Sequence, residues 1–202
     1  MNIQYQSDLS CSFRQILRAA LGLVVVVCGL CGFAYSSIAT GLGQLLFPQQ
    51  ANGSLIVLHD RVVGSSLVAQ PFLQAQYFQP RPSASGYDPM AMAGSNMART
   101  SPELQQVITT RLAHRAQLEQ VALSEIPADL VTASGSGIDP EISVQAAIIQ
   151  CQRIARSRNL SEDQLLALVH QHTIQPTLGW LGQARVNVLQ LNLALDQLQA
   201  KS

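Results

Sequence analysis

The chain has 202 residues, of which 48% are hydrophobic and only 12% are charged, and its formal net charge is zero at pH 7. This length allows one ordinary domain with an appendage, and the composition is apolar for a purely soluble protein. The even charge balance argues against a basic nucleic-acid-binding domain.

An uncharged segment near the N-terminus predicts one membrane-spanning helix. No Asp, Glu, Lys or Arg occurs between Arg18 and Asp60, and "AALGLVVVVCGLCGFAY" (19–35) is almost continuously apolar. Seventeen helical residues rise about 26 Å, and short extensions reach the ~30 Å of the hydrocarbon core. We therefore predict a transmembrane helix over 16–38. A cleavable signal peptide is the alternative, but this apolar core is longer than usual and no clean A-x-A pattern follows it.

Basic residues indicate how this helix is oriented. Arg14 and Arg18 precede it, whereas no Lys or Arg follows until Arg61. Because basic residues stay on the cytoplasmic side, residues 1–15 are expected in the cytoplasm. The rest of the chain is then exported, as a single-pass protein of the plasma (inner) membrane with a periplasmic main domain.

The four cysteines fit this topology. Cys28 and Cys31 form a C-x-x-C pattern inside the predicted span, where we interpret them as small packing residues rather than a redox or zinc pair. Cys11 is expected in the cytoplasm. Cys151 is then the sole cysteine of the exported part, which predicts a domain without an internal disulfide.

The first exported segments predict a linker, a hairpin and a long loop. Residues 39–53 mix glycine, proline and polar side chains, and are expected to form a juxtamembrane linker. Two short β-rich runs, Leu55–His59 and Val62–Leu67, predict a hairpin. Residues 70–101 show neither helical nor strand periodicity, so we expect a long ordered loop, which is unusual enough to be a functional candidate.

A helix is predicted from Ser101, the expected N-cap, through Pro102 to about Leu123. Its apolar residues repeat at three and four positions and predict one buried stripe. On this pattern the polar side chains are expected to face water; they are Arg111, Arg115 and Glu119.

The segment "DLVTASGSGIDPEIS" (129–143) resembles a catalytic loop only superficially. After a short predicted strand over 130–133, its glycines do not have the G-x-G-x-x-G spacing, and Ser136 lacks the flanking glycines of a nucleophile elbow. A P-loop is excluded because the only lysine is Lys201. We interpret the segment as a tight connection with left-handed glycines. An exported serine hydrolase using Ser134 or Ser136 stays the alternative.

Two more helices are predicted after this connection, with a turn between them. One begins near Ser143 and ends at Asn159, and Ser161 with Gln164 predicts a capping box that opens the next helix, to about His170. This helix-turn-helix spacing does not indicate DNA binding, because the domain is exported and slightly acidic; Arg153, Arg156 and Arg158 are expected to complement the helix dipole and carboxylates.

The last segments predict no metal site and one more helix. His170 and His172 stand on different helix faces, so we interpret them as surface residues and not metal ligands. The residues after Asn187 fit strand alternation and helical spacing; we expect a helix with Asn187 as its cap. The overall fold class is thus α/β, with one N-terminal transmembrane helix and a single mixed α/β extracytoplasmic domain over 54–202.

Four long motifs in order carry a family resemblance. They are "RPSASGYDPMAMAGSNMARTSPEL" (81–104), "IPADLVTASGSGIDPEIS" (126–143), "RIARSRNLS" (153–161) and "LGQARVNVLQLNLALD" (181–196). Together they resemble the KdpC family, the C chain of the bacterial potassium-transporting P-type ATPase of the Kdp system. The chain departs from the family pattern at 78–80, at Asn159 and in "AGSN" (93–96), where glycines are usual.

This resemblance implies a non-catalytic subunit of a potassium uptake pump. In the family an A chain carries potassium, a B chain hydrolyses ATP, and a small F chain lies nearby, so the partners expected here are these chains and membrane lipid, and no nucleic acid. No cofactor is expected in this chain, since partner subunits handle ATP, magnesium and potassium. An extracytoplasmic ligand-binding or potassium-sensing module is a further alternative.

We expect the partner surface, or the residues that order it, in two segments. The candidates are Arg81, Ser83, Tyr87, Asn96, Arg99, Ser134, Gly135, Ser136, Gly137 and Asp139. Some of them are expected only to hold the loop together through hydrogen bonds to the backbone.

Overall fold

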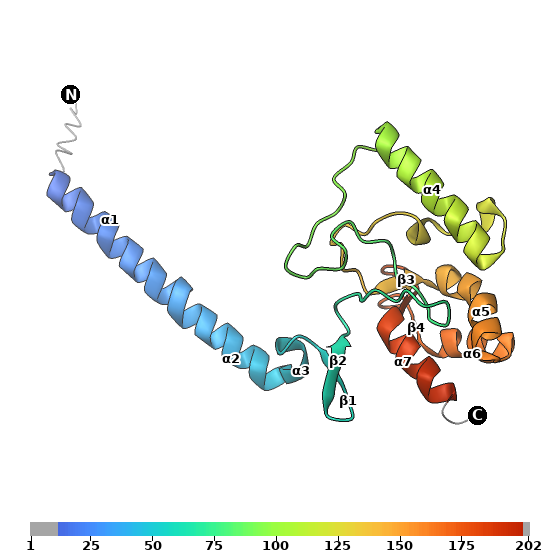
Figure 1. Cartoon of the computed structure of the whole chain (residues 1–202). Coiled ribbons are helices and arrows are strands. Elements are labelled where there is room, and N and C mark those ends of the chain that lie inside the picture. The colour runs from blue at the N-terminus through green and yellow to red at the C-terminus, as the bar shows by residue number, and fades with distance from the viewer. Residues whose placement is uncertain (1–11, 200–202) are drawn as a thin grey trace. The chain divides into compact units, whose positions relative to one another are not determined.

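The computed structural model describes residues 12–199 of the chain. The chain divides into two compact units, Met1–Gly53 and Ser54–Ser202. The first unit is an apolar helix and the second is a mixed helix and strand domain, which confirms the predicted fold class (Figure 1). Cys11 and most of the predicted cytoplasmic segment lie outside the described residues.

Most of the described part of the first unit is one continuous rod of helix. It consists of α1 (Phe13–Val27), the π-helical turn η1 (Cys28–Tyr35) and α2 (Ser36–Leu46), and the short α3 (Pro48–Ala51) follows. Among the described residues, this rod is the one helix whose length and composition allow it to cross a membrane. Residues 39–46, which we expected in the linker, continue the helix, because no proline or charge interrupts it before Pro48.

The predicted hairpin is confirmed. β1 (Leu55–Leu58) pairs antiparallel with β2 (Arg61–Ser65), with an irregularity between Ile56 and Val57. These two strands form a sheet of their own. The described chain then runs without helix or strand until Pro102, which confirms the long loop.

The helix after the loop begins as predicted but ends earlier. α4 (Pro102–Glu119) has Ser101 as its N-cap, and Gln120 adopts the left-handed conformation that ends it, before a 3-10 turn, η2 (Leu123–Glu125). Its expected polar face is wrong. Glu119 is 1% exposed, and the side chain of Arg115 is 11% exposed.

The strand predicted over 130–133 is also wrong. A 3-10 turn, η3 (Ala128–Leu130), ends at the first of these residues, and Leu130 and Val131 donate i→i−3 hydrogen bonds to the carbonyls of Pro127 and Ala128. Three short strands that the sequence did not indicate form the second sheet: β3 (Glu141–Ser143), β4 (Thr173–Ile174) and β5 (Arg185–Asn187). The order is β3-β5-β4, and both pairs are antiparallel.

Three helices pack beside this sheet and supply most of the core. They are α5 (Val144–Arg158), α6 (Glu162–Gln171) and α7 (Val188–Gln199) (Figure 1). The predicted caps at Ser143 and Ser161 and the left-handed end at Asn159 are confirmed. Asn187 accepts a hydrogen bond from the Gln190 amide at 3.1 Å, so it caps α7 as predicted.

Cys151 lies in the centre of this core and is fully buried and free. Burial, with smaller effects of Glu162 and Glu119, raises the pKa of its thiol from 9.0 to about 12. The folded domain therefore keeps this proton at pH values where the unfolded chain loses it. The contribution to stability is complete below about pH 9 and decreases as the pH rises toward 12.

The raised pKa predicts that the Cys151 thiol is unreactive in the folded domain and that the domain becomes less stable at alkaline pH. At pH 8, Cys151 should not react with a maleimide unless the domain is unfolded. Above pH 9, the free energy of unfolding should fall by at most ~1.4 kcal/mol per pH unit through this group. Denaturant titrations of the chain and of Cys151→Ala between pH 8 and 11 measure that slope; equal slopes in the two proteins would contradict it.

Candidate functional site

The loop over 81–99 packs on the connection over 134–139, and we call these two segments together the loop surface. The amide of Ser134 donates to the carbonyl of Pro82 at 3.2 Å. Arg81 and Asp139 form an ion pair with an N–O distance of 3.0 Å. The predicted site residues from two distant parts of the sequence thus meet in one place.

Ser83 and Tyr87 fold the first part of the loop surface on itself. The Ser83 hydroxyl accepts hydrogen bonds from the amides of Ser85 and Tyr87, at 3.1 and 2.9 Å. The Tyr87 hydroxyl donates to the carbonyl of Arg81 at 2.9 Å, and Tyr87 itself has a left-handed backbone, with φ 64°. Burial raises the pKa of this phenol, against opposing effects of Arg115 and Arg111. Both side chains therefore order the loop.

Ser134 and Gly137 form the tight turn expected in the second segment. The buried Ser134 hydroxyl accepts a hydrogen bond from the Gly137 amide at 2.9 Å. Gly137 has φ 76° and lies directly under the first segment, where an added Cβ would be 2.7 Å from the carbonyl oxygen of Ala93. Gly135 does not have a positive φ, and a Cβ added to it would meet no heavy atom within 4 Å. Only one of the two predicted left-handed glycines is confirmed.

This difference gives a matched pair of substitutions. Gly137→Ala should destabilise the domain by about 2 kcal/mol, because alanine disfavours the left-handed backbone and its methyl group would collide with Ala93 and Ser85. Gly135→Ala should change stability by less than about 0.5 kcal/mol. Thermal unfolding of both variants tests this; equal melting temperatures would show that the two segments are not held together as described.

The hydroxyl groups of this turn are not arranged for nucleophilic catalysis. Ser134 accepts from Gly137, and Ser136 accepts from the Ile138 amide at 3.2 Å. Within residues 12–199, neither hydroxyl has a histidine or a carboxylate as hydrogen-bond partner, as an activated nucleophile needs. In the same residues no group of three or more His, Cys, Asp or Glu side chains could hold a metal ion.

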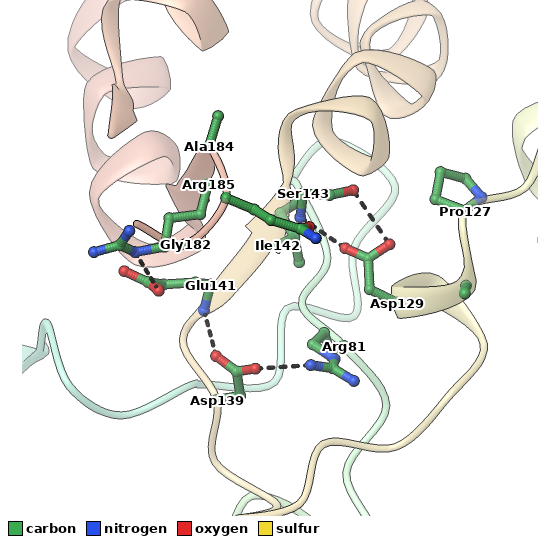
Figure 2. A pocket seen from close by; sticks show the side chains of 12 residues that line it. Arg81, Pro127, Asp129, Asp139, Glu141, Ile142, Ser143, Gly182, Ala184 and Arg185 are labelled. Carbon is green, nitrogen blue, oxygen red and sulfur yellow. Dashed lines mark hydrogen bonds and ion pairs between the residues drawn. The ribbon is translucent and has the colours of Figure 1, made fainter. Parts of the chain in front are cut away.

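A cleft of about 590 Å³ lies beside the Arg81–Asp139 pair (Figure 2). A second ion pair, between Glu141 and Arg185 at 2.8 Å, lies in the same cleft, and Asp139 also accepts a hydrogen bond from the backbone amide of Glu141. On the opposite wall, Asp129 accepts from the Ser143 amide at 2.7 Å. The cleft is therefore braced by internal pairs that join β3, β5 and the loop surface.

The outer edge of the loop surface is exposed. Asn96 and Arg99 are both exposed, and Asn96 has a left-handed backbone, with φ 52°. Met90 and Met92, earlier in the same segment, are also exposed. This edge combines a flexible thioether surface with an amide and a guanidinium, and such groups are frequent in protein interfaces.

Arg153 pairs with a carboxylate as expected, but the buried polar cluster that it forms behind the loop was not predicted. Arg153 donates through Nε to both oxygens of Glu119, at 3.1 and 2.9 Å. It also donates to Gln150 at 2.8 Å and to the carbonyls of Ala75 and Tyr77, where the loop begins. Burial lowers the pKa of the nearby Arg115, although Glu119 opposes this effect. The one indication of this cluster in the sequence is a charged residue near the end of each of two apolar helix stripes, Glu119 in α4 and Arg153 in α5.

Asn192 of α7 also binds the backbone near the start of the loop. Its side-chain amide accepts from the Phe78 amide and donates to the Phe78 carbonyl, each at 2.9 Å. Both residues are buried, so the loop entry is fixed like a strand edge. Gln150 similarly binds both backbone groups of Gln79. Phe78 and Gln79, which precede the Pro80 that departs from the family pattern, are thus held by two helices.

Comparisons with known proteins show the family to which this chain belongs. The model of the KdpC family, described as "K+-transporting ATPase, c chain", matches residues 17–197. The potassium-transporting ATPase KdpC subunit of Xanthomonas campestris pv. campestris (strain B100) is 50% identical over 181 residues, which cover 90% of this chain and 87% of that protein. The KdpC subunits of Serratia proteamaculans (strain 568) and Gemmatimonas aurantiaca are 46% and 49% identical, over 91% and 93% of this chain and 98% and 96% of theirs.

Proposed function

Because the chain belongs to the KdpC family, the c chains of K+-transporting ATPases, we propose that it is a non-catalytic subunit that assembles and stabilises the pump. In this proposal the apolar rod packs in the membrane on the potassium-translocating A chain. The B chain hydrolyses ATP, and the small F chain completes the complex. The domain over 54–202 docks on the outer side of these partners.

The observation that carries the docking role is the construction of the loop surface. Its inner side is held by Arg81, Ser83, Tyr87 and Ser134, through one ion pair and several hydrogen bonds within the domain. Its outer edge leaves Asn96 and Arg99 exposed. A long loop that is fixed from behind and free in front is pre-organised for a partner, since little conformational entropy is lost on binding.

A non-catalytic role is supported by the side chains themselves. The serines of the turn have structural hydrogen bonds, and the sole lysine, Lys201, leaves the 202 residues without a D-K-T-G phosphorylation motif. We therefore assign ATP, magnesium and potassium to the partner subunits. A ligand-binding role for the cleft has less support because Arg81 and Arg185 are each paired with a carboxylate and the third carboxylate, Asp129, accepts hydrogen bonds from Ser143.

We also propose that the N-terminus faces the cytoplasm and the domain faces the periplasm, in the inner membrane. Arg14 and Arg18 flank the apolar rod on one side, and no basic residue follows it before Arg61. The positive-inside rule favours this orientation. ATP would then be on the other side of the membrane from the domain, which agrees with a role other than nucleotide binding.

Co-expression with tagged full chain tests the proposal. The A, B and F chains should co-purify with it in mild detergent, and potassium-stimulated ATP hydrolysis should require all of them. If the A and B chains form a fully active complex without this chain, the proposed role in assembly is wrong. Labelling of Ser134 or Ser136 by a serine-reactive probe would instead support the hydrolase alternative.

A further inference from the structure

A tight apolar turn between β4 and β5 belongs to neither the loop surface nor the core. Thr177 and Leu181 exchange two backbone hydrogen bonds, each of 2.9 Å, and close the turn. Leu178, Gly179 and Gly182 have left-handed backbones, with φ 56°, 82° and 90°. The turn is thus a defined projection rather than a loose loop.

This turn presents large apolar side chains to the outside. Leu178 is 80% exposed, Trp180 is 74% exposed and Leu181 is 54% exposed. No charged side chain occurs from residue 173 to residue 184. Within the described part of the chain, the indole N–H of Trp180 has no hydrogen-bond partner. A left-handed backbone is unfavourable for leucine. The exposed side chain of Leu178 gains little packing energy within the domain that could offset this conformational free energy.

We propose that the turn over 177–181 inserts into the headgroup region of the bilayer in which the chain's own helix is anchored. Tryptophan prefers this region because its ring is apolar and its N–H reaches water or lipid oxygens. An uncharged turn avoids the high cost of placing a charge among lipid tails.

The length of the tether makes the bilayer a permanent neighbour of the domain. Only residues 47–53 separate the end of α2 from the first residue of the domain, Ser54. A domain of this size has a radius of gyration of about 15 Å. The local concentration of membrane surface is therefore high without any further interaction, and a few buried apolar side chains suffice to hold the turn there.

A protein partner fits these observations less well. Protein interfaces surround their apolar centre with a polar rim that fixes orientation. Around this turn the nearest charged side chain that follows is Arg185, which already pairs with Glu141. A lipid surface needs no such complementary rim.

The sole tryptophan makes the test direct. The full chain is placed in phosphatidylcholine vesicles, with and without lipid brominated near the headgroup end of the acyl chain, and Trp180 fluorescence is recorded. We expect bromine to reduce the emission by about half or more, and the emission to be shifted to the blue. Leu178→Asp keeps the reporter, tolerates the left-handed backbone and adds a charge to the tip, so quenching should be lost. Leu123→Asp changes an exposed leucine elsewhere and should leave quenching intact.

Two results would overturn the proposal. Emission that is insensitive to brominated lipid would show that the turn does not enter the bilayer; hydroxyl-radical footprinting that protects Trp180 only when the partner subunits are added would then identify a protein-docking turn. Unchanged quenching in Leu178→Asp, with a wild-type melting temperature, would show that the apolar tip does not bring Trp180 to the lipid. Both readouts are independent of whether the pump assembles.

Discussion

Replacing Arg153 by alanine is expected to reduce the free energy of unfolding of the domain by about 3–5 kcal/mol. The guanidinium is 7% exposed and is the main partner of Glu119, whose side chain is completely buried. Its removal leaves a buried carboxylate with only Arg115, at 3.7 Å, and frees the carbonyls of Ala75 and Tyr77. In a domain of this size the melting temperature should fall by roughly 10–20 °C.

Two control variants show whether the buried cluster is responsible. Arg153→Lys should restore little, because an ammonium group cannot reproduce the five fixed donors of guanidinium. Arg156→Ala, an exposed arginine of the same helix, should change the melting temperature by less than about 2 °C. Thermal unfolding of the full chain in detergent, followed by circular dichroism, measures all three. An equal decrease of the melting temperature in Arg153→Ala and Arg156→Ala would contradict the stabilising role of the buried cluster.

Asn192→Leu is expected to cost about 4 kcal/mol although the two side chains have similar volumes. Leucine cannot bond the Phe78 amide and carbonyl, both of which would stay buried without partners. Each unsatisfied group costs ~1–3 kcal/mol. The loop entry should therefore separate from α7 before the rest of the domain unfolds, and hydrogen exchange at the Phe78 amide should increase by more than a hundredfold.

The control for this substitution lies on the same helix. Gln190 is exposed, so Gln190→Leu introduces the same side chain without burying a polar group. It should change stability by less than about 0.5 kcal/mol. If Asn192→Leu unfolds at the same denaturant concentration as the Gln190 variant, water or another side chain satisfies Phe78, and the helix does not fix the loop.

Features that depend on neighbouring residues could be predicted from the sequence. The caps at Ser101, Ser143 and Ser161 need only a hydroxyl and an amide three residues later, and all three are confirmed. The left-handed end at Asn159 and the hairpin at 55–67 are equally local. The apolar rod could be predicted from composition alone, because an apolar stretch of that length without charges is typical of a membrane-spanning helix.

Features that depend on distant pairing could not be predicted. The helical pattern alone predicted that Glu119 faces water. Its burial depends on pairing with Arg153, which is 34 residues away and cannot be recognised as its partner from the sequence. The strands β3 and β5 pair only three residues each, too few for alternation to be visible, and 44 positions separate Glu141 from Arg185. Residues 130–133 contain apolar side chains, but Leu130 ends a 3-10 turn that begins at Ala128, and the residues after it form no strand.

The sequence also predicted the residues of the loop surface, but not which of them hold the loop from inside and which are exposed at its outer edge. Arg81, Ser83, Tyr87, Ser134, Gly137 and Asp139 hold the segments together. Asn96 and Arg99 remain exposed. A partner surface and an ordered loop need the same residue types, so only burial and hydrogen bonding distinguish the two roles.

The most direct measurement of the docking role is assembly of the pump with the exposed edge removed. Asn96→Gly combined with Arg99→Ala deletes both side chains while glycine keeps the left-handed backbone at position 96. We predict that tagged full chain then retains less than about a tenth of the partner subunits in mild detergent, a loss of ~1.4 kcal/mol or more, while its own melting temperature is unchanged. Arg156→Ala should retain them all. Full retention of the partners by the double variant would show that this edge is not where the domain meets the pump.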